Sequence, residues 1–376
     1  MTARRIALTM IAASHACLPL AHGEDASTLR PREAALVRDY AIQEVRFPGG
    51  DTGVTLAGEL THPHGEGVFP AVVLITGSGP QDRDEATGGH RPFLILSDYL
   101  VRQGFAVLRY DDRGVAASSG DFETAGVPDF AADAAAAMRW LQDQPSVDAS
   151  RTGYVGHSEG GIAGPLAAQE TPSAFLVLLA APALHIRDIL ILREEMNATL
   201  DGTDPEATAA HVQRLRAMFQ AIQSSTSPEQ AFVEGKRRML ALGASEDAAT
   251  GWTGAFTSGP LYWVAKYDPA PTLVSFSGPI LALYGAEDRK IVPAQNAAVA
   301  ERSAEHPASR VVIVPGMNHL FQPVATQERI EYEESDISFD DSALAVIGDW
   351  LEKTIGPHDQ GQREAMDLKS RSADPH

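Results

Sequence analysis

A motif of the form G-x-S-x-G lies near the middle of the chain, as Gly156-His157-Ser158-Glu159-Gly160. It directly follows a β-rich run at residues 152–155 and precedes a helical pattern. Such a sharp turn needs glycine two positions before and after the serine, because a Cβ there would meet neighbouring backbone. The spacing therefore predicts a strand, a tight turn and a helix, with the Ser158 hydroxyl exposed as a nucleophile.

A serine hydroxyl needs a base to accept its proton and an acid to orient that base. Asp288 follows the β-rich run at residues 280–284, and His319 follows the run at residues 311–314. The chain order of serine, aspartate and histidine is that of an α/β-hydrolase. We therefore expect Ser158, Asp288 and His319 to form a catalytic triad.

Both partners of the serine have alternatives. Glu287 is adjacent to Asp288, but a loop at a strand end seldom turns two consecutive side chains inward. His157 is expected to point away from the serine, because it lies on the turn itself. His90 is a further candidate, either as a competing base or as a residue that contacts the substrate.

The oxyanion formed during attack requires backbone N–H donors, one after the nucleophile and one in a loop after an earlier strand. Here these are the N–H groups of Glu159 and Ser78, the latter in the glycine-rich stretch that follows residues 71–75. A phosphate-binding loop is a poor alternative, because Asp82 stands where a third glycine is needed and Pro80 lacks an N–H.

β-rich runs alternate with helical patterns along the chain, which is typical of a mostly parallel sheet with helices on both faces. Each run is expected to be a buried central strand. These strands are predicted at residues 71–75, 105–108, 152–155, 175–179, 280–284 and 311–314, and the helices at 93–103, 130–144, 162–169 and 343–353. Residues 41–60 are expected to form an antiparallel hairpin.

The alternation stops between Leu184 and Gly278, where three helical patterns and no convincing strand occur. We expect this stretch to be a helical cap inserted into an α/β core made of residues 24–183 and 279–356. Trp252, Tyr262 and Trp263 are candidate residues for lining a substrate pocket beneath the cap. Residues 357–376 are polar and aperiodic, which predicts a disordered tail.

The N-terminus has the pattern of a secretory signal peptide, with Arg4 and Arg5 before an apolar run at residues 6–21. The run is too short to span a bilayer comfortably, so we expect cleavage after Gly23 and a periplasmic or secreted protein. Cleavage would remove Cys17, the only cysteine, so that neither disulfides nor a thiolate nucleophile would be possible.

The formal net charge of −20 disfavours binding to nucleic acids and to anionic lipid surfaces. Two carboxylate-rich stretches, Asp82-Arg83-Asp84 and Asp111-Asp112-Arg113, invite a metal-binding hypothesis. Each contains an arginine that can neutralise the carboxylates, so ion pairs are the favoured interpretation and no metal is expected.

The chain resembles exported bacterial α/β-hydrolases of the serine aminopeptidase-like esterase group between about residues 44 and 352. The motifs that carry the resemblance are Gly77-Ser78-Gly79-Pro80-Gln81-Asp82-Arg83-Asp84, His90-Arg91-Pro92-Phe93, Arg109-Tyr110-Asp111-Asp112-Arg113-Gly114, Gly156-His157-Ser158-Glu159-Gly160-Gly161, Tyr267-Asp268-Pro269-Ala270 and Pro315-Gly316-Met317-Asn318-His319-Leu320-Phe321. One departure is Val115-Ala116 after Arg113-Gly114, where such chains often have Arg-Gly-x-Gly.

This resemblance implies carboxylesterase activity on small or short-acyl esters without a cofactor, and Ser158, Asp288 and His319 match the family triad. The expected partner is a small-molecule ester, while the oligomeric state stays open. An unperturbed histidine base predicts that activity falls below about pH 6.5. Two alternatives remain at this point, an aminopeptidase-like amide hydrolase and a non-catalytic binding protein with a hydrolase fold.

Overall fold

The computed structural model describes residues 30–324, 332 and 335–356 of the chain. The predicted signal peptide, with Cys17, and the predicted tail from residue 357 lie outside the described residues. Within them, no helix is both long enough and apolar enough to cross a membrane.

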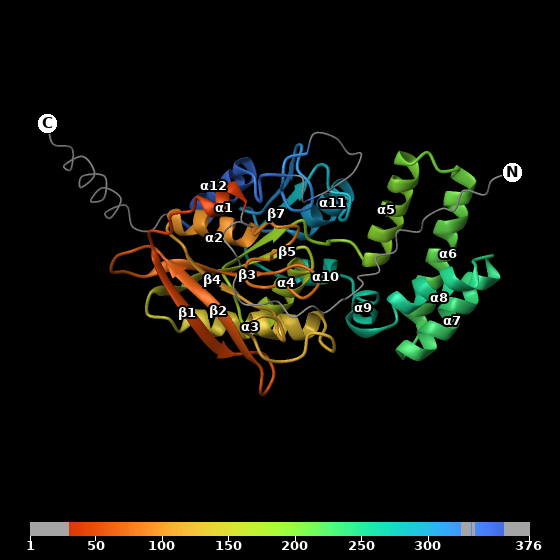
Figure 1. Cartoon of the computed structure of the whole chain (residues 1–376), viewed down its shortest axis with the longest axis horizontal. Helices are drawn as coiled ribbons and strands as arrows, with labels where there is room; N and C mark the ends of the chain where they lie inside the picture. The colour runs from red at the N-terminus through yellow and green to blue at the C-terminus, as the bar shows by residue number, and fades with distance from the viewer. Residues whose placement is uncertain (1–29, 325–331, 333–334, 357–376) are drawn as a thin grey trace.

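The described strands form one mixed, mostly parallel sheet (Figure 1). Their order across it is β1 (Ala41–Pro48), β2 (Thr55–His62), β4 (Ala106–Tyr110), β3 (Phe69–Ile75), β5 (Val147–His157), β6 (Phe175–Leu179), β7 (Ile280–Gly285) and β8 (Arg310–Val314). The first two strands are the predicted hairpin, and β2 is antiparallel to both of its neighbours. From β4 to β8 every pairing is parallel, so the carboxyl ends of these strands all lie at the same end of the sheet, which we call its carboxyl end.

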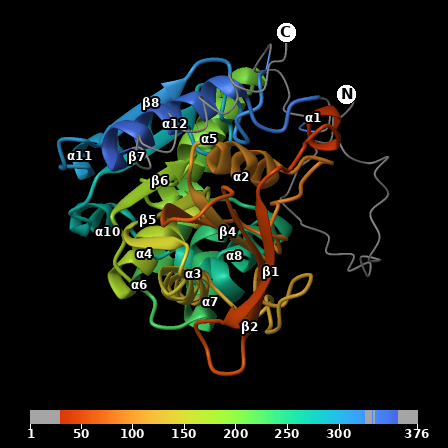
Figure 2. The ribbon, with the colours of Figure 1, turned by 90° about the vertical axis from the view of Figure 1, so that its left-hand side faces the viewer.

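Helices cover both faces of the sheet, as the buried runs of the strands require. One face packs against α2 (Pro92–Arg102) and α12 (Asp341–Ile355), and the other against α3 (Val127–Gln142), α4 (Gly160–Glu170) and α11 (Pro293–Ser303). Figure 2 shows the sheet between α2 and α12 on one side and α3 and α4 on the other. A single turn of helix, α1 (Pro31–Ala34), precedes β1.

The central strands alternate their side chains between the two helical layers. In β3, Val72 and Leu74 belong to the apolar cluster beneath α2 and α12, while Val73 and Ile75 belong to the cluster beneath α3 and α4. All four side chains are essentially inaccessible to solvent. This double burial explains why the strand reads as an unbroken apolar run in the sequence.

Strand β8 differs from the expectation that it would be central. It lies at the edge of the sheet and pairs with β7 only, and Ile313 is 39% exposed. A short run of valine and isoleucine cannot distinguish an edge strand from a central one, because both positions favour β-branched side chains.

The stretch between β6 and β7 is helical. It contains α5 (Ile186–Leu200), α6 (Pro205–Ser224), α7 (Pro228–Ala241), α8 (Glu246–Ala255), α9 (Gly259–Val264) and α10 (Ala270–Ser275). Helices α5 to α8 gather beside the α/β core in Figure 1 and enclose an apolar cluster that includes Leu215, Phe219 and Met239. Near the end of the stretch, Val264 and Leu273 pack into the core of the sheet, whereas Tyr262 packs against the cluster of α5 to α8.

Candidate active site

Ser158 stands on the turn between β5 and α4 with a backbone φ of +50°. Its N–H donates to the carbonyl of Leu179 in the neighbouring strand at 2.8 Å, which fixes the turn to the sheet. A Cβ at Gly156 would lie 2.2 Å from the carbonyl oxygen of Gly160, and one at Gly160 would lie 2.3 Å from that of Ile75. The two glycines are therefore required for a turn that holds a serine in a left-handed conformation.

His319 and Asp288 lie together on loops at the carboxyl end of the sheet, as does Ser158. Nδ1 of His319 is 2.7 Å from Oδ2 of Asp288, and both residues are buried. The other carboxylate oxygen of Asp288 accepts the N–H groups of Lys290 and Ile291 at 2.7 and 2.9 Å. These contacts fix the carboxylate, which in turn orients the imidazole ring.

Among the described residues, no hydrogen bond or ion pair joins Glu287, the alternative acid, to His319. Its N–H donates to the carbonyl of Met317, and the carboxylate oxygen Oε2 is buried without a hydrogen-bond partner among the described residues. Of the two adjacent acids that the sequence offered, Asp288 is therefore the one that pairs with His319.

The ring of His319 lies close to the turn that carries Ser158. Its centroid is 4.8 Å from the ring of His157, which immediately precedes the serine. Among the described residues, however, no hydrogen bond joins the Ser158 hydroxyl to His319. Hydrogen bonds between nucleophile and base often shorten only when the substrate binds.

Burial lowers the pKa of His319, and although Asp288 opposes this effect, the positive charges of His157 and Lys290 add to it. The net shift is downward from the ordinary value of 6.5. A lowered pKa favours the neutral imidazole, which is the form that accepts a proton.

The loop after β3 carries the two glycines expected beside an oxyanion. Neither the N–H of Ser78 nor that of Glu159 donates to any group of the described residues. The N–H of Gly77, in contrast, donates to Oε1 of Glu85 at 2.7 Å. Ser78 and Glu159 thus retain the free donors that an oxyanion requires.

Asp112 braces this loop at both ends. One of its carboxylate oxygens accepts the hydroxyl of Thr76 at 2.8 Å, and the other accepts the N–H of Gln81 at 3.0 Å. Burial raises the pKa of Asp112 well above its ordinary value, and the nearby carboxylates of Glu85 and Glu159 raise it further.

Glu159 and Asp112 line a hollow of about 340 Å³, part of it open to solvent, beside the loop. Its wall also contains the aromatic rings of Tyr110, Phe122 and Phe130. Burial raises the pKa of Glu159 to about 7, so that this carboxyl is partly protonated at neutral pH.

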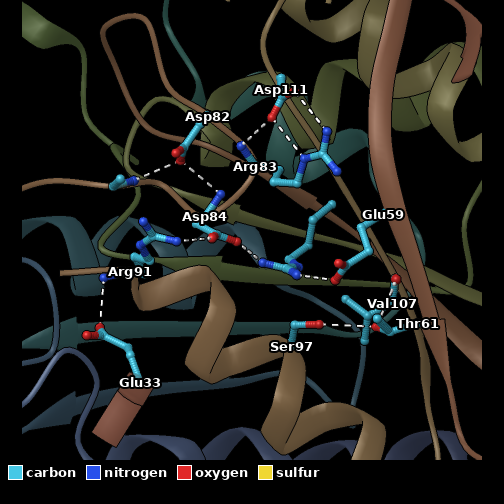
Figure 3. A network of polar contacts seen from close by, with 12 residues as sticks. Glu33, Glu59, Thr61, Asp82, Arg83, Asp84, Arg91, Ser97, Val107 and Asp111 are labelled. Carbon is cyan, nitrogen blue, oxygen red and sulfur yellow. Dashed lines mark hydrogen bonds and ion pairs between the residues drawn. The ribbon is translucent and has the colours of Figure 1, made fainter. Parts of the chain in front are cut away.

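An ion-pair network fixes the rest of the segment between β3 and α2 (Figure 3). Nε and Nη2 of Arg83 each donate to the carboxylate of Asp111 at 3.0 Å, while Arg109 forms ion pairs with both Glu59 and Asp84. The carboxylate-rich stretches thus contribute to ion pairs and hydrogen bonds. The described residues contain no group of three or more His, Cys, Asp or Glu side chains placed to hold a metal ion.

His90, expected at the base or at the substrate, has a different environment. It is fully buried, with Nδ1 2.8 Å from the hydroxyl of Ser338 and Nε2 2.7 Å from the carbonyl of Tyr332. Both ring nitrogens are occupied, so the ring ties the loop before α2 to the segment before α12 and has no position left for a substrate.

The three aromatic candidates of the insertion pack against apolar clusters, Trp252 and Tyr262 against that of α5 to α8 and Trp263 against that of the sheet. Trp252 stacks on Phe256. Trp263 stacks on Tyr267 with ring centroids 4.3 Å apart. None of the three lines the hollow beside Glu159.

Sequence reasoning did not identify Glu85 or Asp112 as residues of the site. Asp112 stands out in the sequence only as part of a carboxylate-rich stretch, and Glu85 has no distinctive spacing. Their respective partners, Thr76 and His157, are distant in the sequence. Only the register of the folded sheet brings these loops together, so no local pattern could have identified them.

Comparisons with known proteins agree with the geometry. A family model described as X-Pro dipeptidyl-peptidase (S15 family) matches residues 51–260, more than half of the chain. Esterase EstD of Thermotoga maritima is 25% identical over 265 residues, which are 70% of this chain and 58% of EstD. The chain spans about half the length of the curated relatives it matches.

Two solved structures share the fold over most of their length. The α/β-hydrolase GrgF from a Penicillium species has a TM-score of 0.51 at 16% identity, over 84% of this chain and 99% of GrgF. The esterase Pf2001 of Pyrococcus furiosus has the same score and identity, over 84% and 92% of the two chains. The predicted α/β-hydrolase fold is confirmed, but the matching family differs from the serine aminopeptidase-like group that the motifs resemble.

Proposed function

Because the chain belongs to the X-Pro dipeptidyl-peptidase (S15) family and has the α/β-hydrolase fold, we propose that it is a serine hydrolase of small or short-acyl carboxylic esters. The observation that carries the proposal is the 2.7 Å contact between His319 and Asp288, at the carboxyl end of the sheet, where the tight turn presents Ser158.

In the proposed reaction, Oγ of Ser158 attacks the ester carbonyl carbon while Nε2 of His319 takes the hydroxyl proton. The N–H groups of Ser78 and Glu159 donate to the oxygen that becomes negatively charged. Asp288 stabilises the imidazolium and holds its orientation. When the carbonyl re-forms, the alcohol leaves with the proton from His319, and the acyl group remains on the serine.

Water then attacks the acyl-enzyme by the same route. His319 accepts a proton from the water, and the resulting tetrahedral intermediate collapses when the proton returns to Oγ of Ser158. The products are a carboxylic acid and the restored serine. These steps use only side chains, backbone donors and water.

The esterase activity of a relative supports the choice of an ester over an amide. EstD, which aligns with 70% of this chain, is named an esterase. The family description favours a second candidate, hydrolysis of a peptide bond after an X-Pro dipeptide. Both reactions use the same acyl transfer chemistry, so the fold does not discriminate between them.

A paired assay tests the proposal. The wild type should hydrolyse p-nitrophenyl butyrate with a kcat/KM at least about tenfold above that for alanyl-prolyl p-nitroanilide. The reverse ratio would favour the peptidase. Ser158→Ala should lower kcat by about 10³-fold or more, whereas Ser150→Ala, at an exposed surface serine, should not.

Covalent labelling separates an enzyme from a silent binding protein. A fluorophosphonate should modify Ser158 in the wild type and leave Ser158→Ala unlabelled. A folded wild-type protein that resists the reagent and hydrolyses neither substrate would contradict the proposal and favour a binding role.

We further propose that the protein is exported after cleavage at Gly23, on the strength of the N-terminal pattern alone. Expression of the full chain in a bacterium, followed by mass spectrometry of the periplasmic fraction, should find Glu24 as the first residue. A cytosolic protein that retains residues 1–23 would contradict export.

A further inference from the structure

We propose that Glu85 and His157 are positioning residues that form a buried ion pair, anchor the oxyanion loop and the loop of His319 to each other, and keep the base in its neutral form. The inference rests on the proposed function in one respect, the role of His319 as the base. The pair itself follows from contacts that are independent of that role.

Both ring nitrogens of His157 face hydrogen-bond acceptors. Nδ1 is 2.7 Å from Oε1 of Glu85, and Nε2 is 3.0 Å from the backbone carbonyl oxygen of His319. A neutral imidazole has one N–H and one lone pair, so it would turn its lone pair toward one of these oxygens. The imidazolium donates to both, and the geometry therefore selects the charged form of His157.

A single carboxylate oxygen connects this imidazolium to the oxyanion loop. Oε1 of Glu85 also accepts the N–H of Gly77, the residue before the proposed donor Ser78. Glu85 has a positive backbone φ of +54°, which is unusual for a residue with a Cβ. The sequence of contacts from Gly77 through Glu85 and His157 to the His319 carbonyl thus spans the site.

The pair lies in an apolar environment that strengthens it. Glu85 and His157 are 3% and 5% exposed, and both border a hollow of about 190 Å³ whose wall includes Phe93, Leu179 and Phe321. Charges separated by a few ångströms in such surroundings are screened less than at the surface. A buried pair of this kind persists only where each charge keeps its partner.

The surrounding charges account for the opposite protonation of the two histidines. Burial alone would lower the pKa of His157, but the charge and hydrogen bond of Glu85, the His319 carbonyl and the charge of Asp288 together raise it. Burial lowers the pKa of His319, which faces Asp288, Lys290 and His157, and the charge of His157 contributes to that decrease. Protonating His319 would place a second positive charge beside the first.

Nitrogen-15 NMR of the histidine side chains in the wild type tests the charge state directly and requires no turnover. One imidazole should retain two protonated nitrogens at pH 7.5, where a free histidine is mostly neutral, and its signal should disappear in His157→Gln. If no histidine is doubly protonated at that pH, or if the signal survives the substitution, the inference is wrong.

The effect on His319 is measured with His157→Gln, whose amide can reach the carbonyl of His319 but carries no charge. A unit charge at 4.8 Å corresponds to about 0.6 pH units even in bulk water. The pKa of His319 by NMR and the acid limb of kcat/KM should both rise by at least that amount. His62→Asn, at the end of the sheet away from the carboxyl ends of the parallel strands, is the matched control. It should change neither the pKa of His319 nor the acid limb of kcat/KM.

Substitutions at Glu85 separate charge from support. Glu85→Gln retains an oxygen that can accept the N–H of Gly77, whereas Glu85→Ala removes it. We expect Glu85→Ala to lower kcat at least about tenfold more than Glu85→Gln, with KM changed less than about threefold in both. Equal losses in the two variants would contradict the anchoring role.

The readouts also distinguish this inference from the proposed function. If the wild type hydrolyses no ester but the NMR shifts appear, the ion pair stands and the proposed activity fails. If ester hydrolysis depends on Ser158 but the acid limb of His157→Gln is unshifted, the activity stands and the inference fails. Should His157→Gln not fold, by near-ultraviolet circular dichroism, the wild-type NMR signal and the two Glu85 variants decide.

Discussion

The environment of His319 determines how far the proposed activity persists on acidification. Burial lowers its pKa below 6.5, so the ring stays neutral and competent as a base at a pH where a free histidine is half protonated. We predict that kcat/KM falls to half its maximum below pH 6.5 rather than at it. A profile measured from pH 4 to 8 whose midpoint lies above 6.5 would contradict this lowered pKa.

Glu159 should limit stability on the alkaline side. Burial raises its folded-state pKa to about 7, above the ordinary 4.5, so folding favours the protonated form. Its stabilising contribution is complete below about pH 4.5 and is lost as the pH rises through 7. We predict that Glu159→Gln is more stable than the wild type at pH 8, by about 1–2 kcal/mol after allowance for partial exposure, and equal to it at pH 4.

Urea denaturation at the two pH values measures this difference. Glu170→Gln, at the exposed end of α4, serves as the control for removal of a carboxylate charge at the surface. A difference between Glu159→Gln and the wild type that stays constant from pH 4 to 8 would show that the carboxyl does not titrate as its burial implies.

Among single residues, the sequence predicted those that chemistry places at fixed points of a motif. Ser158, Asp288 and His319 follow recognisable strand ends, so their positions could be inferred. His90 could not be interpreted correctly, because its environment depends on Ser338 and Tyr332, which are remote in the sequence. Glu85 was missed for the same reason.

The loop between β3 and α2 depends on an arginine buried between two acids. Arg109 is 2% exposed and pairs with Glu59 and Asp84. We predict that Arg109→Met destabilises the fold by about 3 kcal/mol, because it removes the buried cation that bridges the two carboxylates and leaves each with one weaker partner, Arg38 beside Glu59 and Arg91 beside Asp84. Urea titration should show this loss, whereas Arg237→Ala, in an exposed pair with Glu234, should change stability by less than about 1 kcal/mol. Similar losses in both variants would contradict this account.

Elements were predictable where a strand or helix has one consistent environment. The six predicted runs all became strands, and those in β3 to β7 are apolar on both faces because two helical layers cover them. The edge position of β8 was not predictable, since it depends on the order of strands across the sheet. Which side chains of the insertion pack against the sheet and which against α5 to α8 was also not predictable, because no break in composition separates Val264 and Leu273 from the residues before them.

At the scale of the whole molecule, the described residues form apolar cores of two kinds, one around the sheet and one inside α5 to α8. Phe219 is fully buried in the second. We predict that Phe219→Ala accelerates hydrogen exchange mainly in α5 to α8, at a cost of about 3–5 kcal/mol to those helices, while the fluorophosphonate still reacts with Ser158. Phe175→Ala, in the sheet core, should accelerate exchange throughout the chain. Indistinguishable exchange patterns in the two variants would show that the cores unfold together.

The helical insertion begins after β6 and ends before β7, and these two strands are neighbours in the sheet. Because the two strands are parallel, the insertion starts at the carboxyl end of β6 and must return to the amino end of β7, and Val264 in α9 and Leu273 in α10 pack against the sheet core between these points. A segment of different length can therefore replace α5 to α8 without altering the strand order, provided that this return crossover is kept. The nucleophile precedes this junction, while the acid and the base follow it. Exchange of the module between related chains is thus a route by which substrate choice can diverge while the bond-breaking machinery stays the same.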